Sequence, residues 1–315
     1  MLSISVLLSE EEILAGLVED LRARRLPEKY FYWSPQSASA WLALCRSTAY
    51  LNYRRSLGLL VERSASLLES FGRRPAEVVS LGAGDGSKET PILEALAARG
   101  ARPPYVAVDV SQWLLEAALA RAAAAGYRVR GIKADLTRPG HMRAIDEERT
   151  RSPRLYTLLG NTVGALDHAT FLPILAGVLH EDDRLIVDGE IFIPEATRAG
   201  YINPDNRRFA TGPLRALGIL EEDGEVVFDL VEESEPRGLR RLRKHFLAAR
   251  DVDLVAGDER IPIARGERLD MGYSCKYGLD TFHEVLKTFG GLTVEREFVS
   301  KDGGFVLAVA RRDPE

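Results

Sequence analysis

The sequence predicts an α/β fold built around a largely parallel sheet, and two patterns lead to this prediction. From Pro75 to Asp188, short apolar runs of strand length alternate with amphipathic helical segments, which is typical of parallel βαβ units. Near the end of the chain, residues 292–299 and 305–311 flank a turn at 301–304 and predict a hairpin whose last strand is continuously apolar. Five parallel strands closed by such a hairpin give a seven-stranded sheet.

The N-terminal part is predicted to be helical. Ser9 and Glu12 form a capping box before apolar residues at helical spacing, which predicts a helix over about 9–24. A second helical region is predicted from Ser39 to about Phe71. The opening MLSISVLLSEEE has no basic start and runs into three glutamates, so it predicts a strand or an arm rather than a signal peptide.

The alternating segment supplies the strands and helices of the core. The predicted strands are 77–81, 105–109, 128–134, 155–159 and 184–188. The predicted helices lie at about 88–99, 112–125 and 168–179, the second with Ser111 as its N-cap and Gly126 just after its end.

A second lobe interrupts the core. After Asp188 the alternation stops, and residues 194–290 are polar, rich in arginine and broken by Pro and Gly, with strand-like pieces at 224–231 and 268–273. We therefore expect an inserted α+β lobe that binds substrate. The predicted division is an N-terminal helical part of that lobe (1–72), a core (73–193), the insertion (194–290) and a C-terminal hairpin that completes the core sheet (291–315).

Composition excludes several classes of function. The chain of 315 residues carries 42 basic and 47 acidic residues, a net charge of −5, so no overall basic field favours nucleic acid or an anionic membrane. Two cysteines, Cys45 and Cys275, support neither a disulfide framework nor a cysteine zinc site and suggest a reducing compartment, by default the cytoplasm. The five histidines have no ligand spacing, so we expect no metal site.

The most informative segment is a glycine-rich turn between a predicted strand and a helix. Gly82, Ala83 and Gly84 follow the apolar strand 77–81, and the next helix begins near Lys88. Glycines allow a sharp turn that a ligand can approach closely, and a helix N-terminus offers free N–H groups to an anion. A small anionic or nucleoside ligand is expected here, although such a turn can also be purely structural.

Two acidic residues end the neighbouring strands. Asp109 follows Gly82 by 27 residues, where a carboxylate can accept both ribose hydroxyls of a nucleoside, and Asp135 can accept the adenine amino group. Each Asp taken singly could equally be a turn or N-cap residue. Together with the glycine turn, they predict one nucleoside site at the carboxyl edge of the sheet.

Two nucleoside-bearing cofactors compete for this site. A dinucleotide fold favours G-x-G-x-x-G, whereas here the third glycine, Gly86, comes one position early, and no residue stands out as a hydride-relay acid or base. These features favour S-adenosylmethionine (SAM) over NAD. The C-terminal hairpin favours the same choice, because five parallel strands plus such a hairpin form the Rossmann-like sheet of class I methyltransferases.

The chain resembles the SAM-dependent histidine Nα-methyltransferase family of ergothioneine biosynthesis. The similar segments occur in order along nearly the whole chain: Leu26–Tyr32, Leu81–Lys88, Val106–Ser111 against the family's PVDVS, Ala199–Tyr201 and Ser274–Tyr277. The resemblance implies that SAM is held by Gly82, Ala83, Gly84, Lys88, Asp109, Val110, Asp135, Leu136 and Gly160, with Lys88 near the methionine carboxylate. It further implies catalytic roles for Tyr32, Tyr50 and Asn161, and substrate binding by Tyr201, Gly272 and Ser274. Interdomain packing is the alternative role for the tyrosines.

Two departures from the family concern the substrate. The family's loop after the fourth strand ends in an asparagine that contacts the substrate, where this chain has Ala165; Asn161 is the candidate replacement. The family's glutamate that binds imidazole corresponds here to Gly272. Losing two such contacts moves specificity away from histidine.

We therefore predict a SAM-dependent N-methyltransferase for an amino acid, a peptide or a related small amine, and not for histidine. A protein or RNA methyltransferase is one alternative, suggested by the arginine-rich residues 237–244. We interpret that segment as a solvated, ion-paired helix face because acidic residues flank it. A catalytically silent SAM-binding protein is the other alternative.

Overall fold

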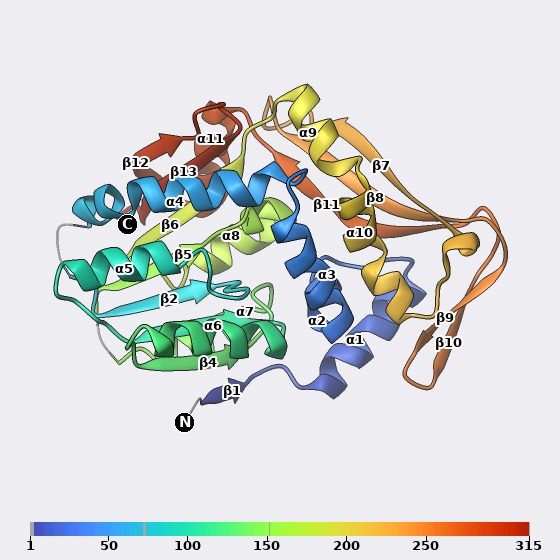
Figure 1. Ribbon diagram of the computed structural model, residues 1–315, viewed down its shortest axis with the longest axis horizontal. Coiled ribbons are helices and arrows are strands. Elements are labelled where there is room, and N and C mark those ends of the chain that lie inside the picture. Colours follow the sequence, from blue (N-terminus) through green and yellow to red (C-terminus); the bar gives the residue numbers. More distant parts are fainter. Residues whose placement is uncertain (1–2, 72–73, 151, 315) are drawn as a thin grey trace.

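The computed structural model describes residues 3–71, 74–150 and 152–314. A helix-covered sheet forms the core, and a second lobe of helices and shorter sheets lies beside it (Figure 1). The domain boundary predicted between residues 72 and 73 lies outside the described residues.

The described part of the chain contains a main sheet of eight strands in the order β1-β4-β3-β2-β5-β6-β13-β12. Strands β4, β3, β2, β5 and β6 are mutually parallel, and β13 is antiparallel to both β6 and β12, as the sequence predicts. The added strand is β1, which pairs with β4 at the sheet edge, so the predicted N-terminal strand is present. The bounds are β1 Ile4–Val6, β2 Glu77–Leu81, β3 Tyr105–Asp109, β4 Val129–Lys133, β5 Arg154–Leu158, β6 Arg184–Glu190, β12 Leu292–Val299 and β13 Phe305–Arg312.

Helices cover both faces of this sheet. On one face pack α4 (Leu51–Ser70), α5 (Thr90–Ala98) and α6 (Gln112–Ala124), whose apolar residues share a buried cluster with the strands. On the other face pack α7 (Pro139–Glu147), α8 (His168–Ala176) and α11 (Leu279–Gly290). Helix α11 lies within the segment expected to be inserted, yet its buried residues belong to the core. Ser111 caps α6 as predicted, its side chain accepting from the backbone N–H of Leu114.

The second lobe has its own apolar cluster, drawn from residues 8–50 and 209–271. Its helices are α1 Glu10–Arg22, α2 Tyr30–Trp33, α3 Pro35–Arg46, α9 Pro194–Tyr201 and α10 Pro204–Ala216. Its strands β7 Gly224–Glu232, β8 Arg240–Ala248 and β11 Arg268–Lys276 form one antiparallel sheet, and β9 Val252–Ala256 pairs with β10 Glu259–Ile263. Short 3-10 turns lie at Thr162–Ala165 and Glu221–Asp223.

One local expectation is refined and another is wrong. The helical region expected at 39–71 is two helices, α3 and α4, because Ser47 is extended and its hydroxyl donates to Asp205 at 2.6 Å and accepts from the Ala49 N–H. The arginine-rich residues 237–244 do not form a helix face but lead into β8, where Arg241 and Arg243 pair with Glu233 at 3.6 and 3.5 Å. The ion pairing that favoured a helix serves equally across neighbouring strands.

Two searches of the described residues were negative. No helix there has both the length and the apolarity needed to cross a membrane. No group of three or more His, Cys, Asp or Glu side chains there could hold a metal ion.

Candidate active site

A cavity of about 420 Å³ lies between the core and the second lobe. Its walls come from the carboxyl ends of β2, β3, β4 and β5, from residues 26–33, which we call the strap, and from α3, α10, β8 and β11. The predicted site residues that line it are Tyr32, Tyr50, Gly82, Ala83, Gly84, Lys88, Asp109, Val110, Asp135, Leu136, Gly160, Asn161, Tyr201 and Ser274. Gly272 is the one predicted site residue that does not line it.

The glycine turn after β2 requires backbone conformations that other residues rarely adopt. Gly82 and Gly84 have φ angles of 71° and 53°. The N–H groups of Gly82 and Ala83 donate to the carbonyl oxygen of Val108 in β3 at 2.8 and 3.0 Å. The turn is therefore fixed against the neighbouring strand and exposes its backbone to the cavity.

Asp109 is held in place by this turn. One carboxylate oxygen accepts from the Gly84 N–H and the other from the Ser111 N–H, both at 2.9 Å. Burial raises the pKa of Asp109, and the backbone donors of Ser111 and Gly84 oppose that shift. Since each carboxylate oxygen can accept a second hydrogen bond, the group fits the two hydroxyls of a ribose.

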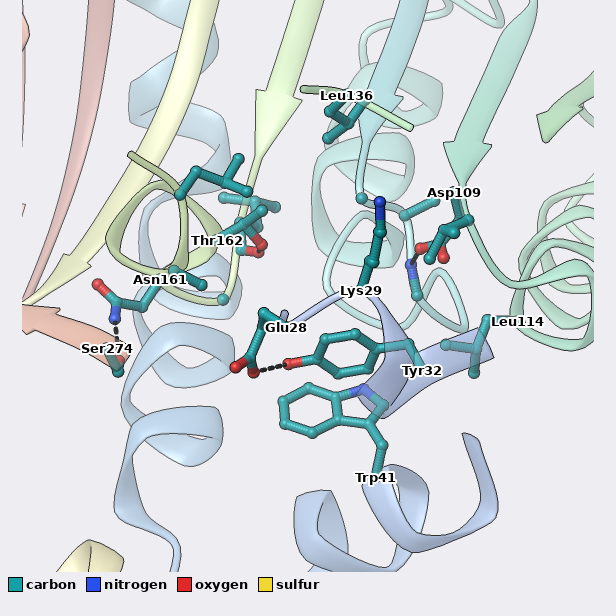
Figure 2. Close-up of a pocket in the computed structure, with 18 of the residues that line it drawn as sticks. Glu28, Lys29, Tyr32, Trp41, Asp109, Leu114, Leu136, Asn161, Thr162 and Ser274 are labelled. Carbon is teal, nitrogen blue, oxygen red and sulfur yellow. Dashed lines mark hydrogen bonds between the residues drawn. The ribbon is translucent and has the colours of Figure 1, made fainter. Parts of the chain in front are cut away.

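Asp135 accepts hydrogen bonds from both lobes. Lys29 of the strap donates to one carboxylate oxygen at 3.1 Å, and the N–H and hydroxyl of Thr137 donate to the other at 2.9 and 2.6 Å. Burial acts to raise the pKa of Asp135, but Lys29 and Thr137 outweigh it and lower the pKa. The strap thus reaches across the predicted adenine position, with Leu136 and Asp109 on either side of Lys29 (Figure 2).

Lys88 carries a charge that no described carboxylate pairs with. The nearest groups its ammonium is seen to contact are the rings of Tyr53 and Trp41, with centroids 5.2 and 6.0 Å away. A Cβ at Gly160 would overlap the Lys88 ammonium, so the glycine is needed for this placement. Burial raises the pKa of Asp188, and the nearby charge of Lys88 opposes that shift. A cation at the cavity wall that makes no ion-pair contact with a carboxylate fits the methionine carboxylate of SAM.

The close approach of Lys88 to Gly160 gives a prediction. Gly160→Ala is expected to lower the affinity for S-adenosylhomocysteine about 10-fold or more, because the Cβ displaces Lys88 and φ is 86° at this position. Calorimetric titration measures the affinity. Gly100→Ala is the matched control, since φ there is 71° and a Cβ meets no atom within 4 Å, and equal losses in both variants would contradict the explanation.

Glu89, at the base of the cavity, is a buried acid with an incomplete set of partners. One oxygen accepts from the Ser80 hydroxyl at 2.8 Å, and the other has no partner among the described residues. Burial raises the pKa of Glu89 to about 7 from 4.5, and hydrogen bonding opposes the shift.

A carboxyl with a raised pKa takes up a proton on folding. The free energy of unfolding is therefore expected to decrease as the pH rises from 4.5 to 7, by on the order of 3 kcal/mol. Glu89→Gln should flatten this dependence on pH. Urea unfolding at several pH values measures it. An unchanged slope in the variant would show that Glu89 does not carry this pH dependence.

The opposite end of the cavity is polar and is built on a buried ion pair. Lys276 contacts Glu190 at 2.7 Å and donates to the hydroxyls of Tyr201 and Ser274 at 2.7 and 2.6 Å. Burial lowers the pKa of Lys276, and Glu190 opposes this. Burial raises the pKa of Tyr201 well above its usual value, and Glu190 adds to the shift, so the phenol stays protonated. The network fixes Tyr201 and Ser274 at the cavity wall.

Asn161 is fully engaged with the protein. Its amide nitrogen donates to Ser274 Oγ at 3.1 Å and to the carbonyl oxygen of Cys275 at 3.3 Å, and its oxygen accepts from the Glu190 N–H at 3.1 Å. Its φ of 58° is one that Asn tolerates better than most residues. The geometry supports a positioning role for Asn161 toward Ser274.

The two predicted catalytic tyrosines differ in their hydroxyls. Tyr32 donates to Glu28 at 2.9 Å, whereas the hydroxyl of Tyr50 makes no hydrogen bond to another described residue, although Tyr50 is only 8% exposed. The ring of Tyr50 packs edge-on against Trp41 and Tyr201, with centroids 6.1 and 6.4 Å apart. An unused hydroxyl on a largely buried tyrosine that lines the cavity is a candidate contact for a substrate.

Sequence reasoning did not single out several residues that line the cavity. Glu28 and Lys29 fall inside the strap motif, and Trp41, Phe209 and Lys244 have no local pattern that distinguishes them. Gly272 lies behind Glu28: a Cβ at 272 would point at Glu28, 3.9 Å from its Oε2 atom. Figure 2 shows the Glu28 carboxylate between Tyr32 and the Asn161–Ser274 pair.

Comparisons with known proteins identify the family. A model of the family described as "Histidine-specific methyltransferase, SAM-dependent" matches residues 9–192, more than half of the 315-residue chain. The chain is 28% identical over 317 aligned positions to the histidine N-alpha-methyltransferase of Mycobacterium tuberculosis (strain CDC 1551 / Oshkosh), covering 96% of this chain and 94% of that protein.

The comparison with solved structures finds similarity to several methyltransferases. The magnesium protoporphyrin IX methyltransferase from Synechocystis PCC 6803, with bound S-adenosylhomocysteine, is 12% identical, with a TM-score of 0.46 and coverage of 90% of this chain and 96% of that one. A SAM-dependent methyltransferase from Clostridium acetobutylicum ATCC 824 is 13% identical, with a TM-score of 0.44 and coverage of 81% and 92%. From the match to the family model over residues 9–192, the chain belongs to the family of SAM-dependent, histidine-specific methyltransferases, and its sheet of parallel strands closed by an antiparallel hairpin is the class I, Rossmann-like arrangement.

Proposed function

We propose that the protein transfers a methyl group from SAM to the amine nitrogen of an amino acid, a peptide or a related small amine other than histidine. The supporting observation is that one cavity joins two ends of different chemistry. At one end lie the glycine turn, Asp109 and the unpaired Lys88; at the other lie Tyr50, Tyr201 and Ser274. A donor bound at the first end would face an acceptor bound at the second.

The residues of the donor end match SAM group by group. Asp109 would take the ribose hydroxyls, Asp135 with Val110 and Leu136 the adenine, and Lys88 the methionine carboxylate. Bound SAM supplies an electrophilic methyl carbon on a sulfonium, so the protein mainly has to position the acceptor and exclude water. The strap and α3 contribute Tyr32 and Trp41 to the cavity wall, where their rings pack edge-on against each other.

The acceptor nitrogen has to be neutral to attack. Free α-amino groups have a pKa of roughly 8, so a usable neutral fraction exists near neutral pH. Glu190, the carboxylate nearest Tyr201, is paired with Lys276, so this end adds no net negative charge that would hold the amine protonated. The hydroxyl of Tyr50 is free to contact the amine.

The exclusion of histidine follows from the two replaced residues. Gly272 has no side chain, and Ala165, on the cavity wall, offers no hydrogen bond. Asn161 does not compensate, because its amide is already used by Ser274, Cys275 and Glu190. A site that loses specific hydrogen bonds discriminates against its former substrate by orders of magnitude.

The test is methyl transfer from radiolabelled SAM to a panel of amines that includes all twenty amino acids. The proposal predicts labelled product with at least one of them and turnover of histidine at least 100-fold slower. Histidine as the best acceptor would overturn the specificity claim. Binding of S-adenosylhomocysteine without transfer to any amine would overturn the enzymatic claim.

A further inference from the structure

The acceptor end of the cavity contains a second ion pair that the proposed reaction does not use. Lys244 of β8 contacts Glu28 of the strap at 2.6 Å, and Tyr32 donates to the other oxygen of Glu28 at 2.9 Å. The side chains of Lys244 and Glu28 are 7% and 15% exposed, and both line the cavity. The Lys244 ammonium also lies 4.0 Å from the centroid of the Phe31 ring. The pair is therefore fixed by its surroundings and open only to the cavity.

Each member of the pair keeps unused hydrogen-bonding capacity. A carboxylate has about four acceptor positions, and Glu28 uses two of them on Tyr32 and Lys244. An ammonium has three donors, and the one hydrogen bond seen for Lys244 goes to Glu28. An acceptor of hydrogen bonds and a donor thus stand side by side.

Gly272 lies next to Glu28 but does not line the cavity. A Cβ there would lie 3.8 Å from the Glu28 nitrogen and 3.9 Å from its Oε2 atom, and φ is 79°, so the chain at 272 passes directly behind Glu28 without a side chain. The Glu28 carboxylate can then be met from the cavity without competition from residue 272.

The charge of this end is balanced. Glu28 is paired with Lys244, and Glu190 is paired with Lys276. A charged distal group of the acceptor would be desolvated here without a counter-charge, which costs several kcal/mol. An apolar group would bury the free hydrogen-bonding positions of the pair, which also costs free energy. The group that avoids both penalties is uncharged and both donates and accepts hydrogen bonds.

We propose that the Glu28–Lys244 pair determines which acceptor is used, by binding an uncharged distal group that donates to Glu28 and accepts from Lys244. A primary carboxamide is the chemical class that matches, with its NH₂ on the carboxylate and its oxygen on the ammonium. This inference rests on the proposed function, since it names the acceptor class for the same site.

The test is calorimetric titration of amino acids into the protein saturated with S-adenosylhomocysteine. L-Glutamine or L-asparagine is expected to bind at least about 10-fold more tightly than L-leucine, L-glutamate, L-arginine and L-histidine. Tighter binding of arginine or histidine would show that Glu28 acts as a lone anion and would overturn the proposal. Equal binding of leucine, or no binding by either carboxamide while S-adenosylhomocysteine binds, would overturn it as well.

Two variants locate the effect at the pair. The double variant Glu28→Leu with Lys244→Leu replaces the ion pair by two apolar side chains, a change that proteins commonly tolerate without losing stability. It should bind the carboxamide about 10-fold more weakly and S-adenosylhomocysteine as tightly as before. Glu28→Gln keeps the shape of the side chain and removes its charge, and it should also bind the carboxamide more weakly. Replacing the exposed pair Arg22–Glu259 by two leucines is the matched control and should leave the preference unchanged.

The methyl-transfer panel separates the two proposals. If some amine is methylated but the carboxamide acceptors are not preferred, the acceptor class proposed for Glu28 and Lys244 fails and the enzymatic function stands. If no amine is methylated, the proposed function fails. A preference for the carboxamide that survives unchanged in both Glu28 variants would overturn the role of the pair.

Discussion

Replacing Lys88 by methionine is expected to lower the affinity for S-adenosylhomocysteine about 10- to 100-fold. Methionine keeps the apolar stem but removes the charge, and a hydrogen bond to an ionised partner contributes roughly 1.5–3 kcal/mol. The loss should fall within this range, because no described carboxylate makes an ion-pair contact with Lys88 and its ammonium lies near the rings of Tyr53 and Trp41. The electrostatic interaction of Lys88 with the buried Asp188 offsets part of it. Calorimetric titration of the ligand measures the change.

Two comparisons make this result specific. Lys301→Met removes a lysine that is 89% exposed beside Glu62 and should leave the affinity within twofold of the unchanged protein. 5′-Methylthioadenosine, which lacks the amino-acid carboxylate, should bind the Lys88 variant and the unchanged protein alike. If the variant lost affinity for both ligands equally, Lys88 would not be the carboxylate contact.

The second large effect is expected at the buried pair. Lys276→Met should lower the free energy of unfolding by about 3–5 kcal/mol, because it leaves Glu190 charged and buried without its partner. Both side chains are almost completely buried, at 0% and 1% exposure. Urea unfolding followed by circular dichroism measures the change.

The control is an exposed pair of the same type. Lys287, which contacts Asp313, is 60% exposed, and Lys287→Met should cost less than about 1 kcal/mol. Adding Glu190→Gln to Lys276→Met should recover much of the lost stability, since the uncompensated charge is then gone. A loss of similar size in the Lys276 and Lys287 variants would contradict this account of the network.

The core fold could be predicted from local patterns because each element carries its own signal. Strands β2, β3 and β12 have the bounds expected from their apolar runs, and the capping box at Ser9 and Glu12 begins α1. Such signals act within a few residues. The added edge strand β1 depends on pairing with β4, and Ile4–Val6 is too short to show that pairing by itself.

The second lobe was harder to predict because its polar strands lack alternation. Residues 240–248 contain four Arg and Lys side chains and one histidine, yet β8 lies between β7 and β11 and buries Leu242, Lys244 and Phe246. Lys244 can be buried only because Glu28, 216 positions earlier, pairs with it. That compensation is a tertiary contact, and no local pattern contains it.

In the site, too, one end could be predicted from local sequence patterns and the other could not. The donor end is formed by consecutive strand ends, whose glycines and carboxylates follow a spacing that the sequence displays. The acceptor end is assembled from the strap, α3, α9, α10, β8 and β11, so Glu28 and Lys244 could not be recognised as neighbours. Asn161 was expected to contact substrate, but whether its amide was free depended on Ser274, Cys275 and Glu190, which only the folded chain brings together.

A crystal structure of the protein with bound S-adenosylhomocysteine tests the central claim most directly. We expect the ribose hydroxyls within hydrogen-bond distance of Asp109, the amino-acid carboxylate at Lys88, and the sulfur directed toward Tyr50, Tyr201 and Ser274. A ligand bound away from the glycine turn, or one whose sulfur faces away from these three hydroxyls, would contradict it.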